Sequence, residues 1–381
     1  MIYFDNAATS YPKPLSVVNE VTKCIKNYCG NPGRGAHSLS RISSEKIYEA
    51  REQIALFFGY DKPENVFFTY NDTYALNMVI KGLVSKGDHI IISDMEHNSV
   101  YRPVACLAEK GFIEFSIFDT MCLCGDRSAD SICEGIKKLI NPRTKMLIAT
   151  HSSNVCSATL PIMQIGALCR SMGIIFVVDA AQSAGHITID MERDNVDVLC
   201  APAHKGLYGI QGCGFVILRD GILPRPIIEG GSGVNSLEIN MPEFSPERFE
   251  AGTLAVPSVV ALCEGIKFVK DRGTDEIHEY ECALFTRAFD MLYAFKGVNI
   301  YAPMHRGSVL LFNVDRIPCE RLSDMLDGYG ICTRSGYHCS PLGHKTLGTP
   351  VGGAVRLSFS PFNTMRELEI FYSAMKGIVG C

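Results

Sequence analysis

Short apolar runs alternate with amphipathic stretches between about residue 63 and residue 220. The apolar runs are rich in β-branched and aromatic residues, which is typical of buried strands; they are ENVFFTY, GDHIIISD, TKMLIAT, GIIFVVD, VDVLCAP and GCGFVIL. Between them, apolar residues three and four positions apart predict helices in DTYALNMVIKGLV, RPVACLAEKG, SADSICEGIKKLI and PIMQIGALCRSMG. This alternation predicts an α/β fold with a mainly parallel sheet, helices on both faces, and a ligand site beyond the carboxyl ends of the strands.

The pattern changes after the Gly- and Pro-rich segment LPRPIIEGGSGVN. Two helical stretches, near 256–272 and 275–295, lead into the strand RGSVLLFNV and a helix near 318–328. The strand AVRLSFS and a helix from Thr364 end the chain. We therefore expect a large α/β domain over residues 15–255 and a smaller α+β domain made of residues 1–14 and 256–381.

Composition narrows the class of protein. The 381 residues are 47% hydrophobic, enough to bury a large core. The formal charge of −5 and the lack of a run of five basic residues argue against a nucleic-acid partner. The start of the chain has no signal-peptide pattern, and no apolar stretch reaches the roughly eighteen residues of a membrane span. We expect a cytoplasmic protein with small-molecule or protein partners and no membrane association.

The sixteen cysteines are scattered through a long chain, which indicates reduced thiols rather than a disulfide framework. No CxxC pair occurs, which argues against a structural zinc site, and we expect no metal.

Two residues at predicted strand ends suggest cofactor chemistry. Lys205 follows VDVLCAP, and a lysine held there out of bulk water has a lowered pKa and can form a Schiff base. Asp179 ends GIIFVVD, where a buried carboxylate needs a facing cation such as the pyridinium of pyridoxal phosphate. A solvated loop lysine and a helix-capping aspartate are the structural alternatives. Thr73 begins a helix whose N–H groups suit a phosphate, or the helix is simply capped by Asn71 or Asp72.

These pieces, in this order, resemble the fold-type I pyridoxal-phosphate enzymes, specifically the class V aminotransferase group that contains the cysteine desulfurases and selenocysteine lyases. The resemblance runs from YFDNAATSYPKP to VRLSFSPFNT, nearly the whole chain. It implies a large domain with a mainly parallel seven-stranded sheet and a smaller α+β domain. It also implies pyridoxal 5'-phosphate as the cofactor.

The resemblance assigns cofactor contacts residue by residue. It implies that Lys205 forms the Schiff base, Asp179 pairs with the pyridine nitrogen and Gln182 bonds the ring oxygen. His97 in MEHNSVYRP matches a catalytic histidine that stacks on the ring. Asn154 in HSSNVCSATLPI matches an asparagine near the cofactor oxygen and the substrate.

Further matches concern the phosphate and the substrate. Thr73 and His204 match phosphate contacts, and Thr253 in RFEAGT matches a threonine that reaches the phosphate of the neighbouring subunit, which implies a homodimer. Arg356 in AVRLSFS matches the residue that binds the substrate carboxylate, and a guanidinium suits that group because it bonds it with two N–H donors. A surface salt bridge is the alternative for this arginine.

The loop GNPGRGAHSLS resembles one that lines the substrate site in the family and contributes Arg34 and His37.

Cys339 in RSGYHCSPLGHK allows three interpretations. An inert buried thiol is the commonest state of a cysteine. A zinc site with Cys332, His338 and His344 lacks compact ligand spacing. The position also matches the catalytic cysteine of the desulfurases, which implies a nucleophile that takes sulfur as a persulfide. We expect His338 or Arg334 to favour its thiolate.

The resemblance thus implies a cysteine desulfurase that converts L-cysteine to L-alanine and supplies sulfur for iron–sulfur clusters, thiolated tRNA or another thio-cofactor. The short segment between Cys339 and the strand of Arg356 resembles the second desulfurase group, whose members often depend on a sulfur-accepting protein. A selenocysteine lyase acting on L-selenocysteine, a class V aminotransferase without desulfurase activity and a non-catalytic scaffold stay open as alternatives.

The chain shows three departures from the family pattern. Pro202 replaces a hydroxyl residue that contacts phosphate, Asn71 and Asp72 replace a glycine or small residue, and Tyr74 replaces a common glutamate. We expect weaker or altered phosphate binding, because a carboxylate repels a phosphate unless it points away.

Overall fold

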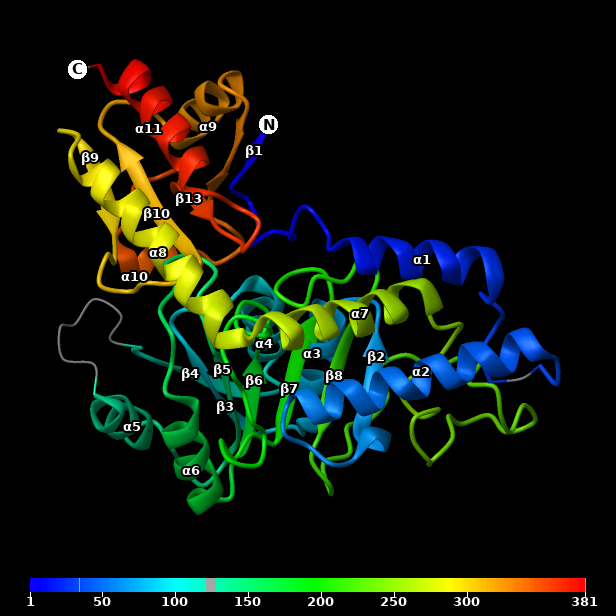
Figure 1. The fold of residues 1–381 in the computed structure, drawn as a ribbon. Coiled ribbons are helices and arrows are strands. Elements are labelled where there is room, and N and C mark those ends of the chain that lie inside the picture. The colour runs from blue at the N-terminus through cyan, green and yellow to red at the C-terminus, as the bar shows by residue number, and fades with distance from the viewer. Residues whose placement is uncertain (34, 121–127, 381) are drawn as a thin grey trace.

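A twisted sheet forms the centre of the larger part of the molecule (Figure 1). The computed structural model describes residues 1–33, 35–120 and 128–380. Within them this sheet has seven strands in the order β2-β8-β7-β6-β5-β3-β4. The strands are β2 (Val66–Thr69), β3 (His89–Ser93), β4 (Glu114–Phe118), β5 (Thr144–Thr150), β6 (Ile175–Asp179), β7 (Val198–Pro202) and β8 (Gly214–Leu218). All neighbouring pairs are parallel except those of β8, so the expected mainly parallel sheet is confirmed.

The edge strand β4 was not predicted from the sequence. It pairs only with β3 among the described strands, and its central residues are exposed or half-buried. An edge strand with one covered face lacks the continuous apolar run that identifies a central strand.

Helices cover both faces of this sheet, as alternate residues of each strand point to opposite sides. Leu147 and Leu199 join the core under α2, α6 and α7, whereas Ile148 and Val198 join the core under α3 and α4. The helices of the larger part are α1 (Leu15–Asn27), α2 (Ser38–Phe57), α3 (Asp72–Leu83), α4 (Asn98–Glu109), α5 (Ala129–Lys137), α6 (Ile162–Met172) and α7 (Val256–Arg272), with a short 3-10 turn at Pro63–Asn65.

The division expected at residue 256 assigned α7 to the smaller domain, whereas α7 packs with the larger part. It lies along α1 and α2, and its residues Val259, Leu262 and Ile266 belong to the larger core (Figure 1). The packing boundary therefore follows Arg272, where α7 ends.

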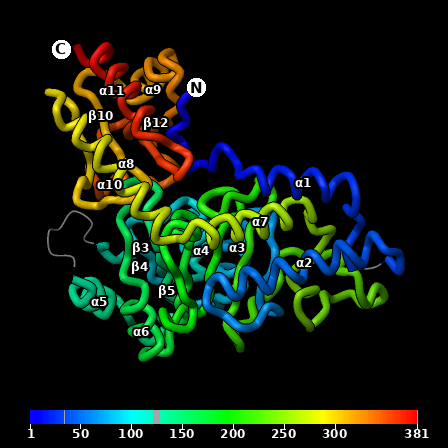
Figure 2. The backbone as a smooth tube through the Cα atoms, viewed as in Figure 1, coloured from blue at the N-terminus to red at the C-terminus, as the bar shows by residue number. Residues whose placement is uncertain are grey.

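The smaller part contains an antiparallel sheet in the order β12-β13-β10-β9. Its elements are α8 (Thr274–Tyr293), β9 (Val298–Tyr301), β10 (Val309–Val314), α9 (Cys319–Gly328), β12 (Arg334–Gly336), α10 (Pro341–Leu347), β13 (Ala354–Ser358) and α11 (Met365–Val379). The N-terminal strand β1 (Ile2–Tyr3) also belongs here, because it pairs in parallel with β11 (Ile331–Cys332). Figure 2 accordingly shows both ends of the chain at this part.

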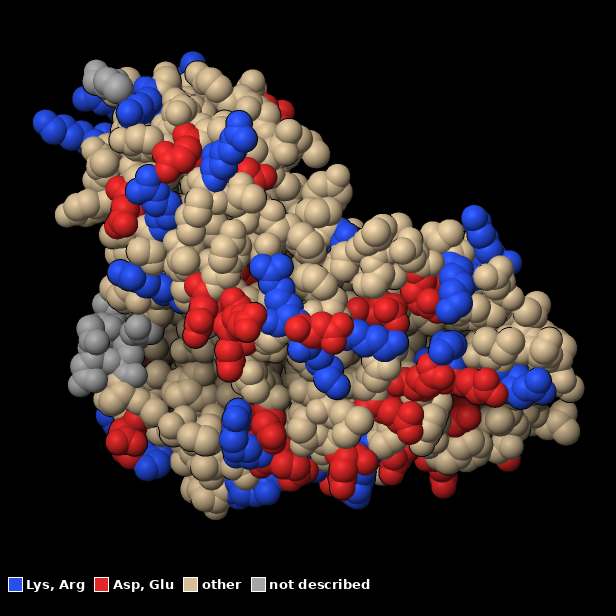
Figure 3. All heavy atoms as spheres, viewed as in Figure 1, with Lys and Arg blue, Asp and Glu red and all other residues tan. Residues whose placement is uncertain are grey.

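The surface carries both signs of charge. Basic and acidic side chains are intermixed across the larger part on the face drawn in Figure 3. That face therefore presents no broad single-sign field of the kind that holds a nucleic-acid backbone. Within the described residues, no helix is both long and apolar enough to span a membrane.

Candidate active site

The carboxyl ends of β6 and β7 bring a lysine and an aspartate into one cavity. Asp179 is the last residue of β6, and Lys205 follows β7 closely. The cavity has a volume of about 190 Å³. Five more of the predicted residues line it: Thr73, His97, Asn154, Gln182 and His204.

The amine of Lys205 and the carboxyl of Asp179 influence each other within this cavity. Asp179 is 1% exposed, and its Oδ1 accepts a hydrogen bond of 2.9 Å from the N–H of Ala181. Burial raises the pKa of Asp179 and lowers the pKa of Lys205, and each partner's charge opposes the effect on the other. An amine with a lowered pKa is the form of lysine that attacks a carbonyl group.

Asp72 is a third ionisable group in the same cavity. Asn71 caps α3, since its Oδ1 accepts a 2.9 Å hydrogen bond from the N–H of Tyr74. The carboxyl of Asp72 is instead buried, and its Oδ1 has no hydrogen-bond partner among the described residues. Burial, followed by the charge of Asp179, raises the pKa of Asp72 well above its ordinary value. Burial and the neighbouring carboxyl group thus favour the protonated form of Asp72.

His97 caps α4 with its imidazole. Its Nδ1 accepts a hydrogen bond of 3.1 Å from the N–H of Ser99, which leaves the ring proton on Nε2. Burial, reinforced by the charge of Lys205, lowers the pKa of His97 to about 4. The ring is thus a neutral donor at physiological pH.

Thr73 and His204 lie on the side of the cavity that suits an anion. Thr73 is in the first turn of α3, where backbone N–H groups favour negative charge. The Nδ1 of His204 is buried without a partner among the described residues, and burial lowers the pKa of this ring to about 4. Pro202, also in the lining, offers no hydroxyl or N–H.

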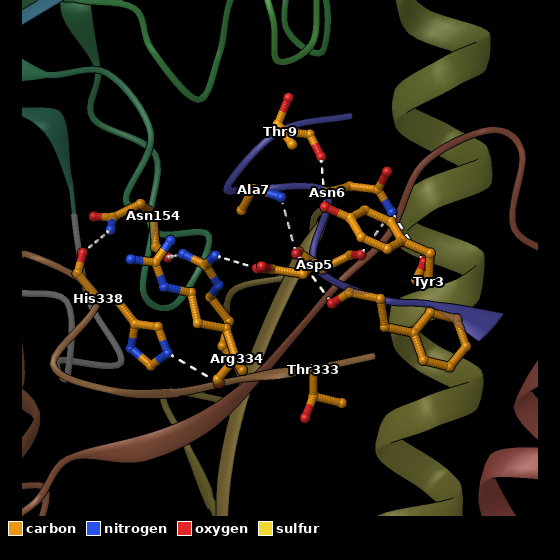
Figure 4. Close-up of polar contacts among 12 residues, drawn as sticks. Tyr3, Asp5, Asn6, Ala7, Thr9, Asn154, Thr333, Arg334 and His338 are labelled. Carbon is orange, nitrogen blue, oxygen red and sulfur yellow. Dashed lines mark hydrogen bonds and ion pairs between the residues drawn. The ribbon is translucent and has the colours of Figure 1, made fainter. Parts of the chain in front are cut away.

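Gln182 and Asn154 connect the cavity with the smaller part of the molecule. Gln182 Nε2 donates to the carbonyl of Ala7 over 3.0 Å. Asn154 Nδ2 donates to the carbonyl of His338 over 2.8 Å, as Figure 4 shows, and its Oδ1 accepts from Ser340 Oγ over 2.7 Å. Asn154 therefore fixes the loop that carries Cys339.

Arg356 lies on β13 and is 2% exposed. Its Nη1 donates to the carbonyl of Asn154 over 3.1 Å, and its Nη2 pairs with Asp5 Oδ1 over 2.7 Å. A guanidinium has five N–H groups, and the Nε of Arg356 has no partner among the described residues. Donors thus remain for a carboxylate ligand.

Cys339 lies in the loop between β12 and α10 and is exposed, so it is not an inert buried thiol. Its carbonyl accepts a hydrogen bond of 2.7 Å from the N–H of Asn98, next to His97. This contact and the bonds of Asn154 join the cysteine loop to residues at the Lys205 cavity.

The expectation that His338 supplies positive charge to the Cys339 thiol is not supported. Burial lowers the pKa of His338 to about 2, with a further contribution from Arg356. The Nε2 of His338 bonds the carbonyl of Arg334 (Figure 4), and its Nδ1 lies 3.0 Å from His344 Nε2. Both ring nitrogens therefore have partners other than the thiol.

Among the described residues, neither Thr253 nor His37 lines this cavity. Thr253 lines a different one, with Tyr70 and Tyr74. His37 caps α2, where its Nδ1 accepts a 3.3 Å hydrogen bond from the N–H of Ser40. Arg34 lies outside the described residues.

A family model for class-V aminotransferases matches residues 2–371. The chain belongs to this family. Its relatives among curated proteins include a "Probable cysteine desulfurase" of Pyrococcus abyssi, 32% identical over 391 residues that cover 100% of this chain and 94% of the relative. Another, from Methanothermobacter thermautotrophicus, has the same description and is 30% identical over 387 residues, covering 100% and 95%.

The chain is also similar in fold to solved structures of this family. The apo structure of a cysteine desulfurase from Thermococcus onnurineus NA1 has a TM-score of 0.89 and 31% identity, covering 99% of this chain and 94% of that one. The cysteine desulfurase CsdA of Escherichia coli has a TM-score of 0.86 and 25% identity, covering 98% and 94%.

Several residues that hold the site together were not found from the sequence. Asp5, Asn98 and Ser340 hold Arg356 or the cysteine loop by contacts between distant segments. No local pattern pointed to them, because a hydrogen bond between residues distant in sequence leaves no local signal. Among the described residues, no group of three or more His, Cys, Asp and Glu side chains is arranged to hold a metal ion.

Proposed function

We propose that this protein is a pyridoxal-phosphate-dependent cysteine desulfurase that converts L-cysteine to L-alanine and retains the sulfur on Cys339 as a persulfide. The position of Cys339 carries the proposal: an exposed thiol lies on a loop bonded to Asn154, which lines the cavity of Lys205. The printed descriptions of the relatives support the same substrate.

The chemistry of the cavity fits pyridoxal phosphate. Lys205 supplies an amine of lowered pKa, and Asp179 supplies a buried carboxyl group for the pyridine nitrogen. Thr73 and His204 offer donors to the phosphate. The cofactor, when bound, withdraws electrons from the substrate α-carbon.

The protein's own groups then bind the substrate and move protons. The free N–H donors of Arg356 hold the substrate carboxylate. Lys205 Nζ accepts the proton that leaves the α-carbon, and the neutral ring of His97 keeps a proton on Nε2 for donation.

Sulfur transfer requires a thiolate at Cys339. The thiolate forms a new S–S bond to the substrate sulfur while the substrate Cβ–S bond breaks. The electron pair of the broken bond stays with carbon, which takes up protons and leaves as alanine. Cys339 keeps the sulfur as a persulfide, and an acceptor thiol later removes it. Since the peptide groups of the loop are bonded to Asn98 and Asn154, the acceptor must come to Cys339, which supports a sulfur-accepting protein partner.

We also propose a homodimer in which Thr253 contributes to the phosphate site of the neighbouring subunit. The separation of Thr253 from the Lys205 cavity within one chain supports this, as does the family resemblance. Sedimentation equilibrium of the cofactor-loaded protein tests it, and a monomer at all concentrations would contradict it. The assignment of Arg34 and His37 to the substrate site stays a prediction.

The decisive experiment uses purified, cofactor-reconstituted protein with L-cysteine and a reductant, and measures alanine and sulfide together. We expect equal amounts from the wild type and a loss of about a hundredfold or more in Cys339→Ser, the scale on which removal of a catalytic group acts. Cys106→Ser removes another exposed thiol on α4 and serves as the matched control.

Two outcomes would contradict the proposal. Alanine and sulfide formation that is unchanged in Cys339→Ser would exclude the persulfide route. No alanine from L-cysteine, with alanine from L-selenocysteine or amino transfer to a keto acid, would assign the selenocysteine lyase or aminotransferase alternative.

A further inference from the structure

The loop at Cys339 has a strained backbone. His338 has a φ of 50° and Cys339 a φ of 57°, and neither residue is a glycine. Side chains crowd the backbone in this left-handed region, so two such residues in sequence persist only if the surroundings hold them. The contacts around the loop therefore decide where the thiol lies.

Backbone groups of the loop are bonded on both sides of the cysteine. The carbonyl of His338 accepts from Asn154, the carbonyl of Cys339 accepts from the N–H of Asn98, and the N–H of Ser340 donates to the carbonyl of Tyr337 over 2.8 Å. The Ser340 hydroxyl also donates to Asn154 Oδ1 over 2.7 Å, and the imidazole of His338 is a further side-chain anchor inside the loop.

A chain of hydrogen bonds fixes this imidazole. His338 Nε2 lies 3.2 Å from the carbonyl of Arg334, which can only accept, so Nε2 carries the proton and Nδ1 is an acceptor. His344 Nε2, 3.0 Å from that Nδ1, must then be the donor. The Nδ1 of His344 therefore accepts, and Thr349 Oγ1 is its donor over 2.9 Å, closer than the 3.3 Å to the carbonyl of His344.

Both rings are neutral at physiological pH, as this chain of bonds requires. His338 is 5% exposed and His344 is 1% exposed. Burial, together with the charge of Arg356, lowers the pKa of His344 to about 4, while His338 also faces Arg334. A single arrangement of protons thus satisfies every nitrogen.

We propose that His344 and Thr349 are positioning residues for sulfur transfer, which hold the strained Cys339 loop by fixing the tautomer of His338. The inference rests on the proposed desulfurase function but concerns residues that do not line the Lys205 cavity. In this proposal His344 on α10 orients the thiol, whereas Arg356 on β13 binds the substrate carboxylate. Carboxylate binding and sulfur transfer are thereby governed by separate groups.

The first test observes the protons directly. Holoenzyme labelled with 15N at histidine is examined by long-range 1H–15N NMR, with assignments from His338→Gln and His344→Gln. We expect the Nε2–H tautomer for both rings at neutral pH. An Nδ1–H tautomer or a charged ring at either position overturns the proposal.

The second test separates a positioning role from a general loss of folding or stability. His344→Phe removes the hydrogen-bond donor to His338, and Thr349→Val removes the hydrogen-bond donor to His344. The conservative variants His344→Gln and Thr349→Ser each keep a hydrogen-bond donor at the same position. We expect the first pair to lower kcat for L-cysteine by about tenfold to a hundredfold with KM nearly unchanged, the scale of a misplacement of about 1 Å. The conservative pair should keep kcat within about threefold, and Lys345→Met, on the exposed side of α10, should match the wild type.

A third measurement does not depend on catalysis. The rate of Cys339 alkylation by iodoacetamide, followed by mass spectrometry of its peptide in folded holoenzyme, should change in His344→Phe and Thr349→Val and be restored in the conservative pair. Equal rates and equal kcat in all four variants would overturn the proposal. If the wild type has no desulfurase activity but the tautomers and alkylation rates behave as expected, the positioning role stands and the proposed function fails instead.

Discussion

Asp72 is the residue whose charge fits its surroundings least. It stands at the first turn of a helix that should receive a phosphate, yet its carboxyl turns inward beside Asp179 and is buried without a partner for Oδ1. Two neighbouring carboxyl groups in a buried site hold a proton more tightly than either would in water. The sequence led us to expect repulsion of the phosphate, and the structure shows that the carboxyl interacts with Asp179 and Lys205.

We expect Asp72→Asn to stabilise the cofactor-free protein at neutral pH. The folded-state pKa of Asp72 is raised above its unfolded value of about 3.9, so its contribution to stability is full below that pH and is lost as the pH rises through the folded pKa. Asparagine imitates the protonated acid, so the gain at pH 7 should be on the order of 1–3 kcal/mol and should vanish near pH 4. Urea unfolding at several pH values measures it.

Asp61→Asn, on an exposed loop, is the matched control and should change stability little at any pH. Equal stability of Asp72→Asn and wild type at pH 7 would mean that Asp72 is ionised without cost in the folded protein.

At the scale of elements, the cysteine loop depends on the close approach of β12 and β13. Gly353, just before β13, has a φ of +89°, and an added Cβ would lie 2.2 Å from the carbonyl oxygen of Gly336 at the end of β12. The carbonyl of Gly353 also accepts a 2.9 Å hydrogen bond from Asn313 Nδ2. In the register of these two strands, Arg334 of β12 lies opposite Arg356 of β13.

Gly353→Ala should therefore destabilise the protein by about 1–3 kcal/mol or more, since it adds both backbone strain and a clash with main chain. Gly135→Ala is the matched control: a Cβ there meets nothing within 4 Å inside α5, and alanine should raise stability by about 0.5–1 kcal/mol. Thermal and urea unfolding of both variants measure the difference. An unchanged Gly353→Ala would show that the two strands separate at little cost.

At the scale of the whole molecule, buried polar contacts join the two parts. His186, in the larger part, pairs through Nδ1 with Glu281 Oε2 on α8 over 2.8 Å, and Glu281 is 0% exposed. Burial disfavours the imidazolium, but the Glu281 carboxylate outweighs burial and raises the pKa of His186. This pair therefore couples the packing of the two parts to pH.

We expect this pair to stabilise the protein on the acidic side of neutrality. The folded pKa of His186 lies above its unfolded value of about 6.5, so the stabilisation is full below about pH 6.5 and is lost as the pH rises through the folded pKa. His186→Gln should be less stable than the wild type at about pH 6, with the difference shrinking as the solution becomes alkaline. Unfolding free energies across that range measure it.

His278→Gln, on the same helix as Glu281, controls for the loss of a histidine. If the difference between His186→Gln and the wild type stays constant with pH, then His186 keeps the same protonation in the folded and unfolded states.

The sequence by itself determined the central strands, most helices and the family. Strands buried on both faces are continuous apolar runs, so β2, β3, β5, β6, β7 and β8 could be predicted, whereas the half-exposed edge strand β4 could not. Lys205 and Asp179 were predicted because each follows such a run at the edge where parallel strands place their ligands. The role of Cys339 came from the resemblance and not from local chemistry.

Only the tertiary structure decided which groups act on one another. It packed α7 against α1 and α2, turned Asp72 toward Asp179, and connected Cys339 to Asn98 and Asn154. It also showed that His338 is neutral and held by His344 rather than charged beside the thiol. Burial and hydrogen bonding between distant segments set these protonation states, and the order of residues along the chain encodes neither in a local pattern.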